Sequence, residues 1–328
     1  MRYLPLLFAA WMLTGVARAA AGDADTCRMP GDPDRRIAAC TRLSDDNRLP
    51  AAMRALVLTS RGLAREQKGD AKGAMADYDE AIQLDPRSAN ARLFRSGLFG
   101  NAANYDRAIE DLSEAIRIDP GVALFYTRRG QSYYAKHDYE RAIADFTESL
   151  RINPDNIDAL WGRGQANTYA GNGGRAVADY TEAIRIEPHA PRGYIARALV
   201  HQSQGDHDLA IADFNEFLSR NRASTSGFYA RGNSYREKGD LDRAIADYSE
   251  AIRLDPRFSF AYHDRGVAYR MKGDREHAIS DFRQSVNLNP DIAGPSRAAL
   301  ESLGAGEPKT EAKSESDAPK RGVLDLLK

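Results

Sequence analysis

The chain has 328 residues, with 46 Lys and Arg against 47 Asp and Glu and a formal net charge of −1. This near-neutral balance argues against a nucleic-acid-binding protein, because such proteins usually carry a strongly basic domain. The length alone favours about two domains, since a single core rarely grows past roughly 250–300 residues. The 15 Tyr and 11 Phe are too many for a solvated coil, so a folded chain is expected.

The first residues form a candidate export signal. Arg2 supplies a positive charge, residues 3–16 are an apolar run, and residues 17–19 fit a small-x-small cleavage site. A membrane anchor is the alternative, but the run is shorter than the roughly 20 residues that a spanning helix needs. We therefore predict a signal peptide over residues 1–19, with cleavage after residue 21 as the alternative. The mature protein is expected to be periplasmic or secreted, with no integral membrane segment.

Cys27 and Cys40 are the two cysteines of the chain. In an oxidising compartment such a pair favours a disulfide. The alternatives are a metal site, a redox pair and two free thiols. Two thiols without a nearby His do not complete a tetrahedral zinc site, and a redox pair usually has the spacing Cys-x-x-Cys. We expect a helix over 34–43, and we expect the disulfide to hold the segment around Cys27 against this helix. Residues 20–54 would then form an N-terminal capping segment.

The part of the chain from residue 55 to residue 292 repeats with a period of 34. Six of the seven periods end in Pro. An Arg recurs at Arg61, Arg95, Arg129, Arg163, Arg197, Arg231 and Arg265. An Asp recurs at Asp77, Asp111, Asp145, Asp179, Asp213, Asp247 and Asp281. A fixed period of this length indicates an array of small structural repeats, and we expect the recurring Arg and Asp to form ion pairs between helices.

Each period contains two apolar stripes at helical spacing. In the third, Tyr126, Gly130 and Tyr133 share one face of a first helix, and Ala142 and Phe146 share a face of a second. Pairs such as Gly-Asp at 239–240 separate the stripes; Gly ends a helix in a left-handed cap, and Asp favours the start of the next. The Pro at the end stops the second helix. Each period is thus predicted to be an antiparallel helix pair.

Small residues at Gly62, Ala74 and Ala81, with Tyr78 and Pro86, resemble the tetratricopeptide repeat (TPR) family. The resemblance implies an all-α, right-handed superhelical solenoid of antiparallel helix pairs, in which the first helix of each pair lines a concave groove. It divides the array into seven units, which are 55–88, 89–122, 123–156, 157–190, 191–224, 225–258 and 259–292.

Two units depart from the pattern. The second has Arg92 where other units carry an apolar residue, and the fifth has no Pro and has Phe217 at a position for a small side chain. We expect these two units to be the least regular and hinge-like, and the second helix of the fifth unit to run longer. After the array we predict a capping helix in 293–304 and a disordered tail, 305–328. The apolar residues 323–327 are either a weakly docked end or a tethered binding motif.

No catalytic signature stands out in the sequence. None of the six His forms a His-x-x-x-His pair, no Gly-x-Ser-x-Gly turn or phosphate-binding loop of the Walker type occurs, and the repeat itself accounts for the recurring carboxylates. We predict that the protein is not an enzyme and needs no cofactor or metal.

The second, fifth, ninth and twelfth positions of each first helix share one face, which the resemblance makes concave. Amides at one register can bind a peptide backbone, aromatic residues offer contact area, and Arg favours acidic or carboxylate groups. The candidate residues for binding a partner are Gln131, Tyr134, Trp161, Gln165, Arg192, Tyr229, Asn233, Arg236, His263 and Arg270. The sequence thus predicts a scaffold or adaptor that binds a peptide or partner protein. The alternatives are a merely solvated face, a face covered by the protein's own tail, and a structural module that forms homo-oligomers by end-to-end stacking.

Overall fold

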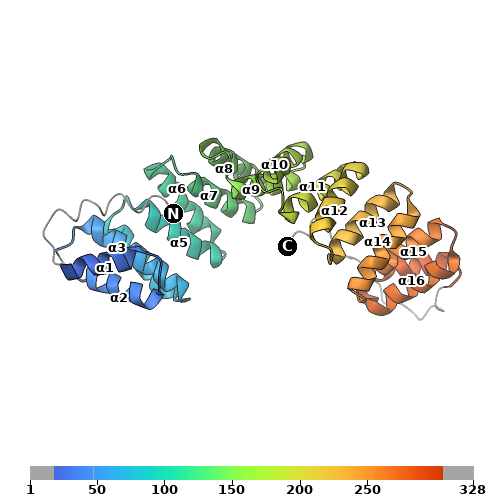
Figure 1. The fold of residues 1–328 in the computed structure, drawn as a ribbon, viewed down its shortest axis with the longest axis horizontal. Coiled ribbons are helices and arrows are strands. Elements are labelled where there is room, and N and C mark those ends of the chain that lie inside the picture. The colour runs from blue at the N-terminus through green and yellow to red at the C-terminus, as the bar shows by residue number, and fades with distance from the viewer. Residues whose placement is uncertain (1–17, 47, 306–328) are drawn as a thin grey trace. The chain divides into compact units, whose positions relative to one another are not determined.

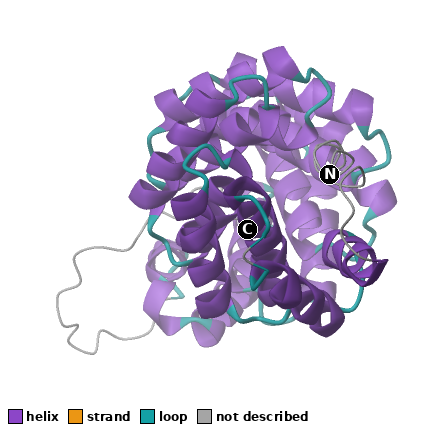
Figure 2. Cartoon of the chain, turned by 90° about the vertical axis from the view of Figure 1, so that its left-hand side faces the viewer, coloured by secondary structure: helices purple, strands orange, loops and turns teal. Residues whose placement is uncertain are grey.

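The computed structural model describes residues 18–305 except residue 47. The chain divides into two compact units, residues 1–166 and 167–328, each of which contains several of the repeats. Within the described residues every regular element is a helix, as Figures 1 and 2 show, and the all-α prediction is confirmed. None of these described helices is both long and apolar enough to cross a bilayer.

The first unit consists of helices that pack in sequential order. They are α1 (Arg18–Arg28), α2 (Pro33–Ser44), α3 (Ala51–Gln67), α4 (Ala71–Leu84), α5 (Ala89–Asn101), α6 (Tyr105–Ile118), α7 (Ala123–Ala135), α8 (Tyr139–Ile152) and the greater part of α9 (Ile157–Tyr169). From α3 to α8, each helix packs on the one that follows it. The predicted helix at 34–43 lies within α2, so the capping segment begins with a helix pair of its own.

The second unit continues the same arrangement. Its helices are α10 (Gly173–Ile186), α11 (Pro191–Gln204), α12 (His207–Arg220), α13 (Thr225–Glu237), α14 (Leu241–Leu254), α15 (Ser259–Met271), α16 (Arg275–Leu288), a 3-10 turn (Pro290–Ile292) and α17 (Gly294–Ser302). The short helix α17 packs on α16 and lies within the predicted capping segment. Residues 1–17 and 306–328 lie outside the described residues, so the signal peptide and the tail stay predictions.

The large apolar residue that follows each repeated Asp lies in the core. All seven are at most 1% exposed, and they are Tyr78, Leu112, Phe146, Tyr180, Phe214, Tyr248 and Phe282. Close packing explains the Gly on the first helix: a Cβ at Gly62 would lie 2.5 Å from Cε1 of Tyr78, well inside van der Waals contact. The small residues of the repeat therefore let the aromatic side chain of one helix lie against the backbone of its partner.

The turns between paired helices mostly follow the predicted chemistry. Gly239 has a φ of 78°, and the Asp240 side chain then caps α14 by accepting a hydrogen bond from the backbone N–H of Arg243. Two turns differ, because Ala103 and His137 occupy the left-handed region with φ of 55° and 60°. The turn geometry is thus kept even where the sequence offers no glycine.

The expectation of a longer second helix in the fifth repeat is wrong, and hinge-like behaviour of the second and fifth repeats stays a prediction. Helices α6 and α12 each have 14 residues, as α14 does, and α12 does not run longer. The backbone N–H of Asn221 bonds to the carbonyl of Phe217 in an extended C-cap like those of other units, and Ser224 then caps α13. Phe217 fits because α13 has Gly227 opposite it, where a Cβ would lie 2.6 Å from Cε1 of Phe217.

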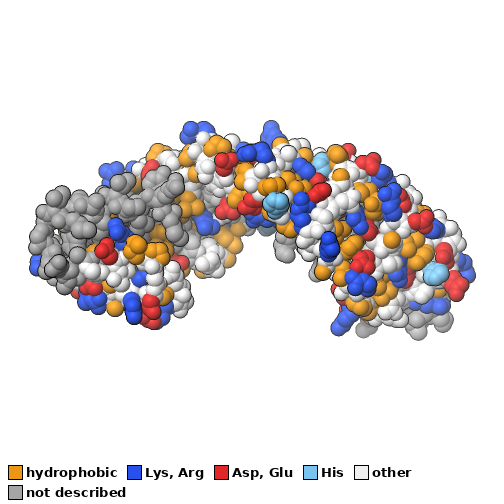
Figure 3. Space-filling model, in the orientation of Figure 1, with side chains coloured by type: hydrophobic (Ala, Val, Ile, Leu, Met, Phe, Trp, Pro, Cys, Tyr) orange, Lys and Arg blue, Asp and Glu red, His pale blue; other side chains and the backbone are white. Residues whose placement is uncertain are grey.

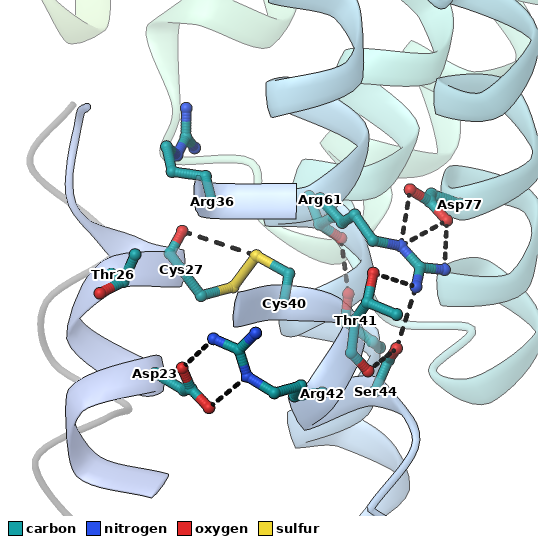
Figure 4. The surroundings of a disulfide bond; sticks show 12 residues. Asp23, Thr26, Cys27, Arg36, Cys40, Thr41, Arg42, Ser44, Arg61 and Asp77 are labelled. Carbon is teal, nitrogen blue, oxygen red and sulfur yellow. Dashed lines mark hydrogen bonds and ion pairs between the residues drawn. A yellow bond between two sulfur atoms is a disulfide. The ribbon is translucent and has the colours of Figure 1, made fainter. Parts of the chain in front are cut away.

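The predicted disulfide between Cys27 and Cys40 is present and joins α1 to α2 (Figure 4). Both cysteines are at most 1% exposed and share a small core with Leu43 and Val57. Beside this core, Nε of Arg42 donates to Asp23 at 2.9 Å, which adds a second link between the two helices. The chain thus closes the N-terminal end of the first unit with a covalent bond and an ion pair.

Candidate functional site

The recurring Arg and Asp residues form ion pairs within the repeats, as predicted. In the third unit Nε and Nη2 of Arg129 donate to the two carboxylate oxygens of Asp145, both at 2.8 Å. The Asp is nearly buried in each pair, and its carboxylate raises the pKa of Arg129 above the usual value. Pairs of this kind include Arg61–Asp77, Arg95–Asp111, Arg129–Asp145, Arg197–Asp213, Arg231–Asp247 and Arg265–Asp281.

The same Arg has a second contact that the sequence reasoning missed. Its Nη1 donates to a side chain 16 residues earlier, on the second helix of the preceding unit, as Arg231 does to Asn215 at 2.6 Å. The six acceptors are Asp79, Ser113, Thr147, Thr181, Asn215 and Ser249. The available signal was a residue able to accept a hydrogen bond two positions after each of the first six repeated Asp residues. We call this series of contacts the arginine ladder.

The arginine ladder extends into the N-terminal cap. Nη1 of Arg61 donates to Thr41 at 3.2 Å and to Ser44 at 3.0 Å, both on α2 (Figure 4). Helix α2 thus contacts the first repeat in the way that the second helix of each repeat contacts the repeat after it. On the side that Figure 3 shows, acidic and basic side chains alternate without a large patch of one sign, which fits charges that are mostly paired.

A hollow of about 410 Å³ lies on the predicted binding face of the first compact unit, at its second repeat. Its floor is α5, where Gly97 and Gly100 occupy the ninth and twelfth positions of a first helix. A Cβ at either glycine would meet no atom within 4 Å, so the space above both is open. The hollow is lined by Glu66, Leu93, Phe94, Ser96, Gly97, Gly100, Asn101, Tyr105, Leu112, Leu124, Arg128, Gln131 and Ser132.

This second repeat, residues 89–122, was not among the predicted binding sites. Its signal was the pair of glycines at positions where the third unit carries Gln131 and Tyr134. Of the predicted binding residues, Gln131 is the one that lines the hollow. Tyr134 lies 5.7 Å from the ring of Tyr139, and Trp161 and Gln165 are half-buried on α9, outside the lining.

The lining of the hollow combines apolar walls with two charged residues. Leu124 is 42% exposed, and Leu93 and Phe94 are more buried. Glu66 accepts a hydrogen bond from the hydroxyl of Tyr78, and burial raises the pKa of Glu66. Arg128 is exposed and donates to the amide oxygen of Gln131 at 3.1 Å. A ligand there would meet one acidic group and one basic group beside an apolar surface.

In the second compact unit, residues 167–328, several predicted binding residues form a hydrogen-bonded network within the protein. The hydroxyl of Tyr229 donates to Asp264 at 2.5 Å, and Nη1 of Arg236 donates to the other oxygen of Asp264 at 2.5 Å. The hydroxyl of Tyr248 donates to Asn233 at 2.7 Å, and burial raises the pKa of Tyr229. Arg236 therefore has its charge balanced within the protein.

The remaining predicted residues divide between the interior and the surface. Nδ1 of His263 lies 2.8 Å from the hydroxyl of Ser296 on α17, and burial lowers the pKa of His263. Arg192 pairs with Glu187 at 2.9 Å in an exposed ion pair. Arg270 is exposed, with its guanidinium 5.9 Å from the centre of the Phe282 ring.

Comparisons with known proteins agree with the repeat register. Models of the tetratricopeptide repeat match residues 123–156, 259–292, 59–123 and 163–227, and a model described as TPR repeat matches 232–273. Together these matches span more than half of the chain. No curated protein sequence matches it significantly.

Solved structures with the same fold include a tetratricopeptide repeat protein from Parabacteroides merdae, with a TM-score of 0.54 and 18% identity over 76% of this chain and 96% of that one. MamA is similar with a TM-score of 0.50 and 23% identity, covering 52% of this chain and 93% of MamA. A MamA fragment from Desulfovibrio magneticus has a TM-score of 0.50 and 20% identity, with coverage of 52% and 96%. The matched models, the helix pairs and the 34-residue period together show that this chain belongs to the tetratricopeptide repeat family.

Proposed function

We propose that this protein is a non-catalytic scaffold that binds a peptide segment of a partner protein on the face lined by its first helices. The observation that carries the proposal is the hollow at Gly97 and Gly100, which lies on that face. Its volume of about 410 Å³ is in the range of pockets that hold small ligands. Interfaces between proteins often depend on one large side chain that fills such a pocket.

The lining defines the chemistry of the segment that fits. Leu93, Phe94 and Leu124 favour a large apolar or aromatic side chain, and the amides of Asn101 and Gln131 are suited to hydrogen bonds with a peptide backbone. Arg128 is exposed at the same place, whereas Arg236 is neutralised by Asp264. We therefore assign the expected contact with an acidic group to Arg128.

End-to-end self-association is less favoured by the arginine ladder. In six preceding second helices the ladder ends on a residue that accepts a hydrogen bond, but the equivalent position on α16 is Arg283. Helix α17 also packs on α16, and at the other end of the chain the first Arg of the ladder, Arg61, is already bound by α2. The C-terminal end of the second unit is therefore poorly suited to extending the array.

The location that best fits this function is an oxidising compartment outside the cytosol. The disulfide between Cys27 and Cys40 supports it, because such bonds persist where thiols are not kept reduced. The apolar run at residues 3–16 supports export from the sequence side.

A library of phage-displayed peptides tests the proposal without a known partner. The purified protein should enrich peptides with a common apolar anchor, and the variant Gly97→Leu with Gly100→Leu should lose this enrichment. Leu is a better helix former than Gly, so the variant is expected to keep its fold, as circular dichroism will show. Gly174→Leu, at an exposed glycine of α10 with equally open space, is the matched control. Equal enrichment by all three proteins would overturn the proposal.

A further inference from the structure

We propose that the hollow on α5 binds a peptide segment in which a Lys or Arg lies beside the apolar anchor, and that Glu66 selects this base. The inference rests on the proposed function, because it names the chemistry of the segment that enters the same site. Every contact that supports it lies within the first compact unit.

Glu66 gives the hollow its negative charge. Among the described residues that line the hollow it is the one acid, and it lies in the last turn of α3, at the twelfth position of the first helix of its repeat. In the six later repeats this position carries Gly, Tyr, Thr, Gln, Arg and Arg. An acid is therefore not a requirement of the repeat pattern at this position, and it needs a local explanation.

The Glu66 carboxylate is half-buried without a balancing cation. Its hydrogen-bond donor is the hydroxyl of Tyr78, and among the described residues it forms no ion pair with a Lys, Arg or His side chain. Arg36, on the neighbouring helix α2, donates instead to the amide oxygen of Gln67 at 3.0 Å. Burial raises the pKa of Glu66, because the ionised carboxylate is less well solvated there than in water. A cation on the ligand would supply the charge that the fold does not provide.

The carboxylate is held in position before a ligand arrives. The ring of Tyr78 is fully buried, and it packs so tightly on α3 that a Cβ at Gly62 would lie 2.5 Å from its Cε1. Packing therefore fixes the hydroxyl that donates to Oε1 of Glu66, and Tyr78 acts as a positioning residue. Among the described residues Oε2 has no hydrogen-bond donor, so it can accept one from a Lys or Arg of the ligand. A preorganised acceptor of this kind loses little side-chain freedom on binding.

The two charges of the hollow come from different neighbours of α5. Glu66 belongs to α3, the first helix of the preceding repeat, and Arg128 belongs to α7, the first helix of the following repeat. These helices follow one another along the first unit (Figure 1), and the open space above Gly97 and Gly100 lies on the helix between them. The segment that fits thus carries its base toward α3, its apolar anchor over α5 and its acid toward α7.

A phage-displayed library of random peptides tests the assignment on the whole protein. Peptides selected by the unmodified chain should be enriched in Lys or Arg beside their shared apolar anchor. Glu66→Gln keeps an acceptor for the Tyr78 hydroxyl but removes the charge, so it should select the same anchor without the base. Glu140→Gln removes an exposed carboxylate of α8 that does not line the hollow, and this matched control should still select the base.

The affinity of one enriched peptide then gives the size of the effect. Fluorescence anisotropy is measured at an ionic strength of about 0.15 M, where charges more than about 8 Å apart are largely screened. Replacing the base of the peptide by Gln should weaken binding to the unmodified chain about tenfold and binding to Glu66→Gln less than about twofold. A purely structural role of Glu66 would not produce this difference, because misfolding would weaken the binding of both peptides alike.

Two results would overturn the inference: selected peptides that have no base beside the anchor, or an equal preference for the base in the Glu66→Gln variant. The proposed function fails in a different way, when enrichment no longer depends on Gly97 and Gly100. Peptides that depend on these glycines but carry no base would contradict the role of Glu66 alone. Absence of any enriched peptide would contradict both.

Discussion

Phe217 of α12 packs directly against the backbone of Gly227 on α13, so closely that a Cβ on Gly227 would lie 2.6 Å from Cε1 of the ring. A large residue of the fifth repeat, at a position for a small side chain, is thus matched by a glycine in the first helix of the sixth repeat. The two residues compensate for each other, and we expect their effects on stability to be coupled.

The first prediction follows from this contact. Gly227→Ala should destabilise the protein by about 1–3 kcal/mol, because overpacking a filled core forces side chains from their preferred rotamers. In a Phe217→Ala background the same substitution should cost much less, since the remaining close neighbour, Cδ2 of Leu218, is the end of a flexible side chain. Urea unfolding of the four proteins of this cycle measures the coupling; additive effects would contradict it.

The second prediction concerns the arginine ladder. Replacing Arg231 by Leu leaves Asp247, which is 6% exposed, without its guanidinium partner. Removing one partner of a buried ion pair typically costs about 3–5 kcal/mol. Arg253→Leu is the matched control, because the Arg253–Glu250 pair is exposed and should contribute little to stability. Equal losses in the two variants would show that the buried pair has no special role.

The third prediction concerns pH and His263. Burial lowers the pKa of His263, an effect opposed by Asp264 and reinforced by Arg236 and Arg270. Below about pH 6.5 the unfolded chain therefore binds a proton that the folded chain does not, and stability falls as the pH drops through this window. The variant His263→Gln should lose part of this pH dependence in thermal melts between pH 7 and pH 5. An NMR titration that finds the pKa of His263 at or above that of an unburied His would contradict the mechanism.

The fourth prediction concerns the N-terminal cap. Joining Cys27 to Cys40 closes a loop with a sequence separation of 13, and a disulfide of about this size contributes about 3 kcal/mol in the chain-entropy model. Reduction with dithiothreitol should therefore lower the melting temperature of the protein. A variant with both cysteines replaced by Ser should melt at this lower temperature whether or not the reductant is added. A reductant-induced shift that persists in this variant would show a different cause.

Most of the fold could be predicted from the sequence, because each repeat contains residues that mark where its helices begin and end. Arg and Asp recur at fixed positions, and Gly239 followed by Asp240 marks a turn by known backbone chemistry. A longer second helix was wrongly expected in the fifth repeat, because Phe217 was considered alone. Its compensation by Gly227 depends on a contact between neighbouring helices, which a single-helix pattern does not reveal.

The candidate site was harder to predict, because the reasoning looked for side chains that are present. Tyr229, Asn233 and Arg236 have the chemistry of a binding surface, yet each makes a contact inside the protein. The hollow of the second repeat arises from two side chains that are missing, at Gly97 and Gly100. Whether a polar residue is engaged within the fold depends on three-dimensional proximity, as between Arg236 and Asp264.

The arginine ladder gives the array a direction. Each Arg joins its own repeat to the one before it, so the residue two positions after a repeated Asp must accept a hydrogen bond wherever another repeat follows, as Ser249 does. At either end of a shortened array water would solvate the freed groups, because it both donates and accepts hydrogen bonds. The ladder therefore constrains the junctions inside the array and not its ends. To lengthen it, the change required at the end of the ladder is Arg283 to a residue that accepts a hydrogen bond.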